Sequence, residues 1–335
     1  MFFRQYNLDC LSLFSYMIGD PTTGRAVVID PQRDIGQYVA DADAAGLRIE
    51  RVIETHFHAD FLSGHLELAE ATGAVISYGS VAKPDFTIDP LTHGAVLSLG
   101  EVTLEVRHTP GHTPESISIV VREHPTSPPW AVLTGDTLFI GDVGRPDLLT
   151  SVGHSADDLA RMLYRSLHGQ LLTLPDDTLV FPAHGAGSAC GKNLSAAASS
   201  TIGDQRRFNY ALAAIDEDQF VRAVTEGQSA APAYFAFAAD ANKHTHPLLD
   251  DHEAPPMITI ERALELVESG AVLIDTRAPE VFASGYVRGA INVGLDGRFA
   301  EYAGDVVRPG QRVVVLSDTG RATEARVRLA RIGFD

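Results

Sequence analysis

Cysteine is almost absent from this sequence, because only Cys10 and Cys190 occur among 335 residues. Two cysteines so far apart form neither a disulfide framework nor the spacing of a zinc finger, and such sparing use fits a reducing compartment. Positive charge is also scarce, with 26 Lys and Arg against 44 Asp and Glu and a formal net charge of −18. Such a chain repels nucleic acid and anionic membranes, so neither is an expected partner.

Long apolar runs are missing as well. No stretch approaches the roughly 20 apolar residues that span a bilayer. The start, MFFRQYNLDCLSLF, lacks the continuous apolar segment of a signal peptide. We see no internal repeats and no low-complexity tracts. These absences predict a cytoplasmic protein, and its 13 histidines indicate that metal chemistry would use nitrogen and oxygen ligands.

Strand and helix signals alternate along the chain. Apolar runs around Gly- and Pro-rich turns predict strands near the start, and RIERVI predicts a strand that leads into ETHFHADF. Apolar spacing and capping residues predict helices over 34–45, over 63–71 with Ser63 as the cap, over 157–167, over 259–269 with Thr259 as the cap, and over 323–331. The pattern indicates an α/β protein.

A change in composition near residue 246 marks a domain boundary. The stretch DANKHTHPLLDDHEAPPM is polar, charged and rich in proline, which is typical of a linker. A chain of 335 residues has room for about two domains. We therefore divide it into a first domain over 1–245, a linker over 246–257 and a smaller α/β domain over 258–335.

Candidate metal ligands follow four of the expected strands. His56 and His58 end RVIETHFH, His112 ends LEVRHTPGH, Asp136 ends AVLTGD, and His184 ends TLVFPAH. Binding sites form at strand ends along one edge of an α/β sheet, because loops converge there on a rigid support. Residues two apart in an extended chain face the same side, so Asp60 continues the spacing of the first two histidines. The sequence therefore predicts a metal site built from these side chains.

Several motifs carry a resemblance to a known family. THFHAD, HTPGHTPES, TGDTLF and PAHG, in this order, resemble the metallo-β-lactamase superfamily over roughly residues 1–245. THFHAD, TPGHTPESIS, GDVGRPDL and STIGDQRRFNYAL are more similar to the persulfide dioxygenases, and PAHGAGSACGKN resembles the persulfide dioxygenase–rhodanese fusion proteins. The superfamily implies an αββα sandwich. The family implies one non-haem Fe(II) per chain, for which zinc can substitute.

The resemblance also implies roles for the candidate ligands. The iron would be held by His56, His112 and Asp136. The remaining three match positions that bind metal in dinuclear zinc relatives, and here they would surround the iron ligands or form an alternative metal site; they are His58, Asp60 and His184.

One position of the first motif departs from the dinuclear pattern. That pattern, T-H-x-H-x-D-H, requires a histidine at position 61, where this sequence has Phe61. Two histidines and one carboxylate leave positions open, which suits Fe(II) and O₂, whereas zinc hydrolysis commonly uses a hydroxide between two metals. The resemblance thus implies oxidation of a low-molecular-weight thiol persulfide, such as glutathione persulfide, to sulfite and thiol in sulfide detoxification. The alternative is a glyoxalase II-like zinc thioester hydrolase, that is, a hydroxyacylglutathione hydrolase.

Four residues are candidates for contact with the thiol. Glutathione and coenzyme A are anionic, so an acidic protein needs a local cationic patch to bind them. Arg145 and Arg206 match family positions near the thiol site, and Lys192 follows His184 closely; for each, a surface charge is the alternative. Cys190 either exchanges persulfide with the substrate or is a small buried residue, which we favour. The physiological thiol and the formation of a homo-oligomer stay open.

The second domain resembles a rhodanese domain through LIDTRAPEVFASGYVRGAINV and RVVVLSDTGRATEARVRLARIGF. Active rhodaneses carry a persulfide on a cysteine that opens the loop after the VVVL strand, and that position is Ser317 here. An alcohol cannot carry sulfane sulfur, and Asp318 adds negative charge to a loop that should hold an anion. We expect a degenerate loop, up to Arg321, without sulfurtransferase activity. Because the chain stops at RIGFD, we expect this domain to be incomplete and a longer parent chain to add a downstream rhodanese domain.

Overall fold

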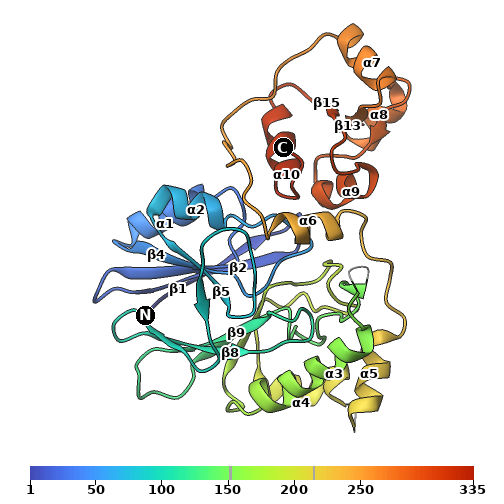
Figure 1. Cartoon of the computed structure of the whole chain (residues 1–335). Helices are drawn as coiled ribbons and strands as arrows, with labels where there is room; N and C mark the ends of the chain where they lie inside the picture. The colour runs from blue at the N-terminus through green and yellow to red at the C-terminus, as the bar shows by residue number, and fades with distance from the viewer. Residues whose placement is uncertain (151–152, 214–215) are drawn as a thin grey trace.

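The structure is a computed structural model that describes residues 1–150, 153–213 and 216–335. Two six-stranded sheets stack face to face with helices on their outer sides, and a smaller domain sits on one end of this sandwich (Figure 1). The expected αββα sandwich with an appended α/β domain is confirmed. Within the described residues, no helix has the length and hydropathy needed to cross a bilayer.

The first sheet has the spatial order β1-β2-β3-β4-β5-β6. Its strands are β1 (Phe2–Leu8), β2 (Leu13–Asp20), β3 (Arg25–Ile29), β4 (Arg48–Ile53), β5 (Val75–Gly79) and β6 (Asp89–Leu91), and its covering helices are α1 (Gly36–Ala44) and α2 (His65–Thr72). Pairing is antiparallel up to β3 and parallel beyond it, which is why α1 is needed as a crossover between β3 and β4.

The helix expected from Ser63 begins later than the sequence predicted. Its N-cap is Gly64, and no side chain caps it. The Ser63 hydroxyl donates instead to Glu54 (3.1 Å), so Ser63 belongs to a buried polar network. Gly64 is needed because a Cβ there would lie 2.2 Å from the Gln32 carbonyl oxygen. At the other end, Gly73 takes the expected left-handed conformation (φ 73°).

The second sheet has the order β12-β11-β10-β9-β8-β7. Its strands are β7 (Val96–Ser98), β8 (Thr103–His108), β9 (Ile117–Arg122), β10 (Ala131–Gly135), β11 (Leu179–Pro182) and β12 (Ser200–Thr201). The flanking helical segments are α3 (Ala156–Ser166), the π-helical turn η2 (Leu167–Leu171), α4 (Ile202–Phe208), the 3₁₀ turn η3 (Tyr210–Ala213) and α5 (Glu217–Thr225). α3 starts one residue earlier than expected, where Ser155 accepts a hydrogen bond from the backbone of Asp158.

Strand alternation sorts apolar side chains into separate layers. Tyr16 and Ile18 of β2 pack between the two sheets, while Met17 points to the other face and packs under α1 and α2. In the second sheet Ile119 faces the inner layer and Val120 faces α3. Both sheets are therefore covered on both faces, and the loops at one edge are left free to form a site.

The smaller domain is built on a parallel sheet of order β14-β13-β15. Its elements are α7 (Ile260–Glu268), β13 (Val272–Asp275), α8 (Pro279–Ser284), β14 (Ile291–Asn292), α9 (Phe299–Val306), β15 (Val313–Leu316) and α10 (Ala322–Ala330). Thr259 caps α7 as expected, by accepting from the backbone of Arg262. Between α6 (Phe235–Ala241) and α7, a segment without helix or strand carries the chain across, where the linker was expected.

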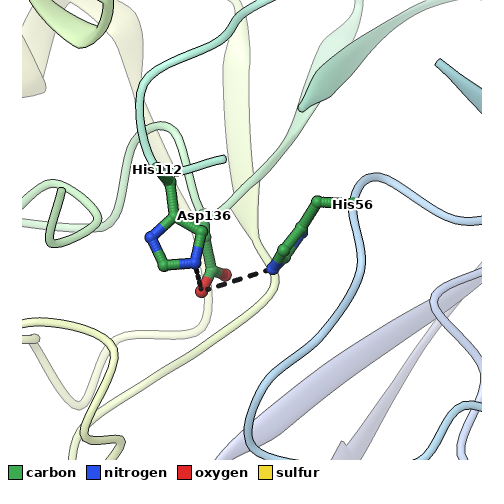
Figure 2. Close-up of side chains that lie close together, drawn as sticks. All are labelled: His56, His112 and Asp136. Atoms are coloured by element: carbon green, nitrogen blue, oxygen red, sulfur yellow. Dashed lines mark ion pairs between the residues drawn. The ribbon is translucent and has the colours of Figure 1, made fainter. Parts of the chain in front are cut away.

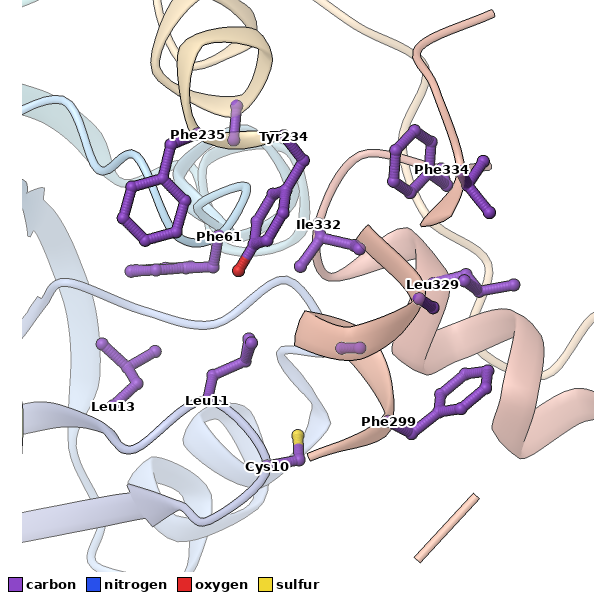
Figure 3. Packing of buried hydrophobic residues seen from close by; sticks show 14 of the residues in the cluster. Cys10, Leu11, Leu13, Phe61, Tyr234, Phe235, Phe299, Leu329, Ile332 and Phe334 are labelled. Carbon is purple, nitrogen blue, oxygen red and sulfur yellow. The ribbon is translucent and has the colours of Figure 1, made fainter. Parts of the chain in front are cut away.

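The two domains share one apolar cluster, which we call the seam. From the sandwich it takes Leu11, Phe61, Tyr234 and Phe235, and from the small domain Phe299, Leu329, Ile332 and Phe334 (Figure 3). Polar contacts reinforce it, since the backbone amide of Leu62 donates to the Arg331 carbonyl oxygen (2.7 Å). The fully buried Arg33 donates to Glu67 (2.8 Å) and to Asp335 (2.8 Å) across the seam.

Candidate metal centre

Three of the predicted ligands meet at the edge of the two sheets. His56 follows β4, His112 follows β8, and Asp136 directly follows β10. Each is 1% exposed. The Nε2 atoms of His56 and His112 lie 3.8 and 3.5 Å from the same atom, Oδ2 of Asp136 (Figure 2). Strands far apart in the sequence thus deliver two imidazoles and one carboxylate to one point.

Hydrogen bonds fix which imidazole nitrogen faces that point. The Thr55 hydroxyl donates its single proton to Asp30 (2.8 Å), so it accepts from Nδ1 of His56 (2.9 Å). Nδ1 of His112 lies 2.9 Å from the Arg145 carbonyl oxygen, which can only accept. Both rings therefore carry their proton on Nδ1 and present a bare lone pair on Nε2.

This arrangement fits a bound metal cation. The two Nε2 lone pairs and Oδ2 of Asp136 are all acceptors, and Oδ2 has no hydrogen-bond partner although it is buried. Acceptors packed together without a donor repel one another, and a cation between them removes the repulsion. Burial opposes ionisation of Asp136, but the neighbouring His184 outweighs it and lowers the pKa of the carboxyl group, which keeps it an anionic ligand.

His184 lies behind this trio rather than in it. Its Nδ1 is 2.7 Å from Oδ1 of Asp136, and its Nε2 is 2.7 Å from Oδ2 of Asp60. Burial favours the neutral ring, but Asp136 and then Asp60 outweigh it and raise the pKa of His184 to about 10 in the metal-free protein. The imidazolium then donates from Nδ1 to Asp136 and orients it, while Nε2 forms an ion pair with Asp60.

His58 lies against a second pair of carboxylates. Its Nε2 is 3.1 Å from Asp30 and 3.4 Å from Glu54, and its ring centroid is 4.3 Å from that of Phe61. Burial favours the neutral ring, but Asp30 outweighs it and raises the pKa of His58. His58, Asp60 and His184 can also bring one ligand atom each within 4.8 Å of one another, so they form a second potential metal group.

Phe61 occupies the position of the missing histidine. It is 1% exposed and packs in the seam beside Tyr234 and Phe235 (Figure 3). The Tyr234 hydroxyl donates to the backbone carbonyl of Asp60 (3.0 Å), which holds the metal-binding loop from the side of α6. An apolar wall with a packing role thus stands where dinuclear relatives would have a ligand.

Two of the four candidates for thiol contact are neighbours, because the backbone amide of Arg145 donates to the Cys190 carbonyl oxygen (3.0 Å), and the side chains of the other two point elsewhere. Arg145 is buried, and its guanidinium donates to Asp147 (2.7 Å) and to the carbonyls of Ala189 and Ser229. Arg206 binds Asp176 and the carbonyl oxygens of Leu172 and Leu174, which lie between η2 and β11. Lys192 binds the carbonyl oxygens of Ala223 and Glu226, at the end of α5.

Cys190 lies beside the metal centre. It is 1% exposed, and its sulfur can lie within 4.8 Å of ligand atoms of Asp136 and His184. Burial, together with the negative charges of Asp60 and Asp136, raises the pKa of this thiol well above its usual value. The side chain is therefore protonated near neutral pH and behaves as a small buried residue there.

The residues that orient the ligands escaped the sequence analysis. Asp30 and Thr55 fix His56, Glu54 contacts His58, and a backbone carbonyl fixes His112. Asp30 carried a usable signal, because it ends the apolar strand RAVVID in the way that Asp136 ends AVLTG. The Arg145 carbonyl carried no signal in the sequence, because its contact with His112 arises only when the chain folds.

The loop of the small domain lacks comparable chemistry. Ser317 follows β15, at the place where the resemblance put a sulfur carrier. Asp318 is exposed, and Arg321 is held by Asp296 (3.0 Å) and Glu324 (2.9 Å). A cation that is already paired with two carboxylates has little attraction left for an anion.

Comparisons with known proteins agree with this geometry. The sequence profile of the metallo-beta-lactamase superfamily matches residues 8–184, and that of the rhodanese-like domain matches 259–335. Human mitochondrial persulfide dioxygenase ETHE1 is 31% identical over 233 residues, which are 68% of this chain and 82% of that protein. A hydroxyacylglutathione hydrolase of a Polaromonas strain is 37% identical over 51% of this chain and 61% of its own length.

A solved structure extends the similarity to the whole chain. The crystal structure of a metallo-beta-lactamase from Staphylococcus aureus COL has a TM-score of 0.90 and 32% sequence identity, and the match covers 100% of this chain and 96% of that one. The chain therefore belongs to the metallo-beta-lactamase superfamily, is a homologue of the ETHE1 persulfide dioxygenases, and carries a rhodanese-like domain.

Proposed function

We propose that the chain is a non-haem iron persulfide dioxygenase acting on low-molecular-weight thiol persulfides, with one Fe(II) held by His56, His112 and Asp136. The observation that carries the proposal is the convergence of two bare Nε2 atoms on one unpartnered carboxylate oxygen. Two histidines and one carboxylate on one side of a metal are the arrangement typical of iron oxygenases. Bound there, the iron would supply a common binding point for the persulfide sulfur and O₂.

The reaction is balanced by one water. A persulfide RSSH, one O₂ and one H₂O give RSH and sulfurous acid, which ionises to sulfite. The terminal sulfur is oxidised, O₂ is reduced, and the S–S bond breaks when water releases the oxidised sulfur. The proton on the departing thiolate sulfur can come from that water.

Residues around the trio support this chemistry in separate ways. His184, between Asp136 and Asp60, holds the carboxylate in place and can keep or return a proton at Nε2. Phe61 and the seam exclude bulk water from one side of the site. Cys190 stays a thiol beside the site. Sulfide detoxification in the cytoplasm is the setting that we propose, with the thiol persulfide and O₂ as the partners.

Anaerobic purification followed by metal analysis and an oxygen-electrode trace tests the proposal. O₂ uptake should require both Fe(II) and glutathione persulfide, and sulfite should form in the same amount as O₂ is consumed. A zinc-loaded sample should take up none.

A zinc thioester hydrolase is the second candidate, favoured by the similarity to the Polaromonas hydroxyacylglutathione hydrolase. Hydrolysis of S-lactoylglutathione by the zinc form, without O₂ uptake by the iron form, would decide for it. We expect the opposite, because Phe61 removes a ligand that a second zinc ion would need.

A further inference from the structure

Helix α6 lies between the sandwich and the small domain (Figure 1). Tyr234 forms its N-cap and Asn242 forms its C-cap. Between them, Phe235, Ala238 and Ala239 are buried in the seam, to which both domains contribute. The two ends of this helix are therefore held in place by the packing of both domains.

Asn242 satisfies the backbone of the metal-binding loop. Residues 56–62 contain no helix or strand, and all of them are buried, so their backbone polar groups need partners from elsewhere. The side chain of Asn242 donates from Nδ2 to the carbonyl oxygens of His58 (2.8 Å) and Phe61 (2.8 Å). Its Oδ1 accepts from the backbone amide of Ser63 (2.9 Å). One side chain thus holds three backbone groups of the loop.

These three contacts require a carboxamide at position 242. The side chain of Asn242 is fully buried, and it must offer two N–H donors and one acceptor at the same time. The orientation of the amide is fixed, because the two carbonyl oxygens can only accept and the amide of Ser63 can only donate. An aspartate has the same shape and would keep the contact with Ser63. Its second oxygen, however, would face two carbonyl oxygens and repel them.

Tyr234 holds the same loop from the other end of α6. Its hydroxyl donates to the backbone carbonyl of Asp60 (3.0 Å). The carboxylate of Asp60 forms an ion pair with His184 (2.7 Å), which in turn donates to the metal ligand Asp136 (2.7 Å). A displacement of the loop at Asp60 would therefore be passed on to the ligand.

The small domain reaches α6 at two glycines. A Cβ at Gly304 of α9 would overlap with the ring of Tyr234, and a Cβ at Gly333 would lie 2.9 Å from a ring carbon of Phe237. The ring of Phe237 also stacks on that of Phe334, with 5.8 Å between the centroids. The rhodanese-like domain thus packs directly against the residue that hydrogen-bonds to Asp60.

We propose that Asn242 and Tyr234 are positioning residues for the metal-binding loop, and that the rhodanese-like domain sets the metal affinity of its neighbour by holding α6 in place. The inference rests on the metal site of the proposed function, but metal affinity can be measured without turnover. Residues that orient metal ligands typically account for about 10–100-fold in metal affinity.

Zinc titration of the full-length protein in competition with a chelator tests the role of Asn242. N242D should bind zinc at least about 10-fold more weakly than wild type, because the loop loses two hydrogen bonds and gains repulsion at two carbonyl oxygens. Leu171→Ala removes a buried side chain beneath the second sheet and should lower the melting temperature while zinc affinity stays at the wild-type value. Wild-type zinc affinity in a folded N242D would overturn the inference.

Gly304→Ala tests the path from the small domain and changes no residue of the sandwich. The position is helical, so alanine suits the backbone, but the added methyl group must displace the ring of Tyr234. We expect zinc affinity to fall about 10-fold. Gly285→Ala, where nothing lies within 4 Å of the added carbon, is the matched control and should bind zinc like wild type. Equal zinc affinity of these two variants would contradict the role of the small domain.

The two proposals fail in different ways. If no persulfide supports O₂ uptake by the wild-type iron protein while N242D and G304A still bind zinc more weakly, the dioxygenase assignment fails and the positioning role stands. If wild type is an active dioxygenase and both variants keep its activity and its zinc affinity, the positioning role fails and the dioxygenase stands.

Discussion

The loop after β10 and the loop after β15 occupy equivalent places in their domains, yet they carry different side chains. Asp136 directly follows β10, is 1% exposed and lies near three imidazoles. Ser317 directly follows β15, is only partly buried and is followed by the exposed Asp318. Both strands are parallel to a neighbour and deliver a residue to the same kind of edge. The comparison shows that a strand end determines where a residue lies, whereas the chemistry possible there depends on which side chain occupies it.

The seam shows what the rhodanese-like domain contributes to the metal centre. Its residues pack on Phe61, and its backbone accepts a hydrogen bond from Leu62, which directly follows the metal-binding motif. A domain without a sulfur carrier thus still holds the loop that carries Asp60. The predictions below break or sharpen this contrast, from the largest expected effect to the smallest.

Removing the carboxylate of the reactive loop should have the largest effect. Asp136→Ala is expected to lower O₂ uptake more than about 100-fold and to abolish tight iron binding. Even the mutation of residues that only hydrogen-bond to metal ligands lowers metal affinity or activity about 10–100-fold. Circular dichroism should show the fold intact. Asp177→Ala, at an exposed carboxylate of the same domain, serves as the control and should keep activity and iron. Full activity of Asp136→Ala would remove the basis of the assignment.

Restoring the missing histidine should change the number of metals. Phe61→His is expected to raise zinc content from about one towards two ions per chain and to lower dioxygenase activity, because Asp60, His184 and the new ring could hold a second ion. Since Phe61 also packs in the seam, Phe61→Leu is the matched control, which loses the ring without gaining a ligand. Metal analysis decides, and two tightly held ions in wild type would contradict the single-iron site.

Cutting the charged contact across the seam should destabilise both domains together. Arg33→Ala removes the ion pair with Asp335 across the seam and also leaves Glu67, in the same domain as Arg33, buried without its partner; breaking a buried ion pair costs about 3–5 kcal/mol. Urea unfolding followed by tryptophan fluorescence and by circular dichroism should shift by the same amount with both probes. The outcome that speaks against a shared seam is a shift in one probe only. Arg48→Ala, at an exposed arginine, should be near neutral.

Asp20, whose contacts all lie within the sandwich, should make the stability of the fold depend on pH. Asp20 accepts from Thr22 (2.9 Å) and from the backbone of Glu101 (2.6 Å) and Val102 (3.2 Å); burial opposes its ionisation, but these hydrogen bonds outweigh it and lower its pKa from 3.8 to about 2. A depressed pKa stabilises the fold above pH 4, and this is lost as the pH falls towards 2. Asp20→Asn should therefore lose about 2 kcal/mol at pH 7.

The pH series provides its own control. The difference in unfolding free energy between wild type and Asp20→Asn should shrink between about pH 4 and pH 2 and disappear below that range. A difference that stays constant down to pH 2 would show that the hydrogen bonds do not depend on the charge.

The smallest expected effect is none at all. Wild type should form no thiocyanate from thiosulfate and cyanide, because Ser317 cannot carry sulfane sulfur. Ser317→Cys should restore little, since Asp318 remains and Arg321 stays paired with Asp296 and Glu324. Thiocyanate formation by wild type that persists in Cys190→Ala would show that the loop is not silent.

Much of the site could be predicted from strand ends, and the rest depends on folding. His56, His112 and Asp136 follow apolar runs in register, so their convergence is visible in the sequence. The buried state of Arg145 is not visible, because the carbonyls that accept from it come from Ala189 and Ser229, far along the chain. The predicted cap at Ser63 was wrong for a related reason, since its hydroxyl donates a hydrogen bond to Glu54 and does not cap the helix.

The seam couples the two domains that the sequence indicates. Segments 1–245 and 258–335 each have their own sheet, yet apolar side chains of both, such as Phe61 and Phe299, pack in one shared cluster. Neither can unfold without exposing the apolar surface of its neighbour to water, a penalty proportional to the area exposed. Heating should therefore melt the protein in a single calorimetric transition, with an enthalpy per mole that belongs to all 335 residues.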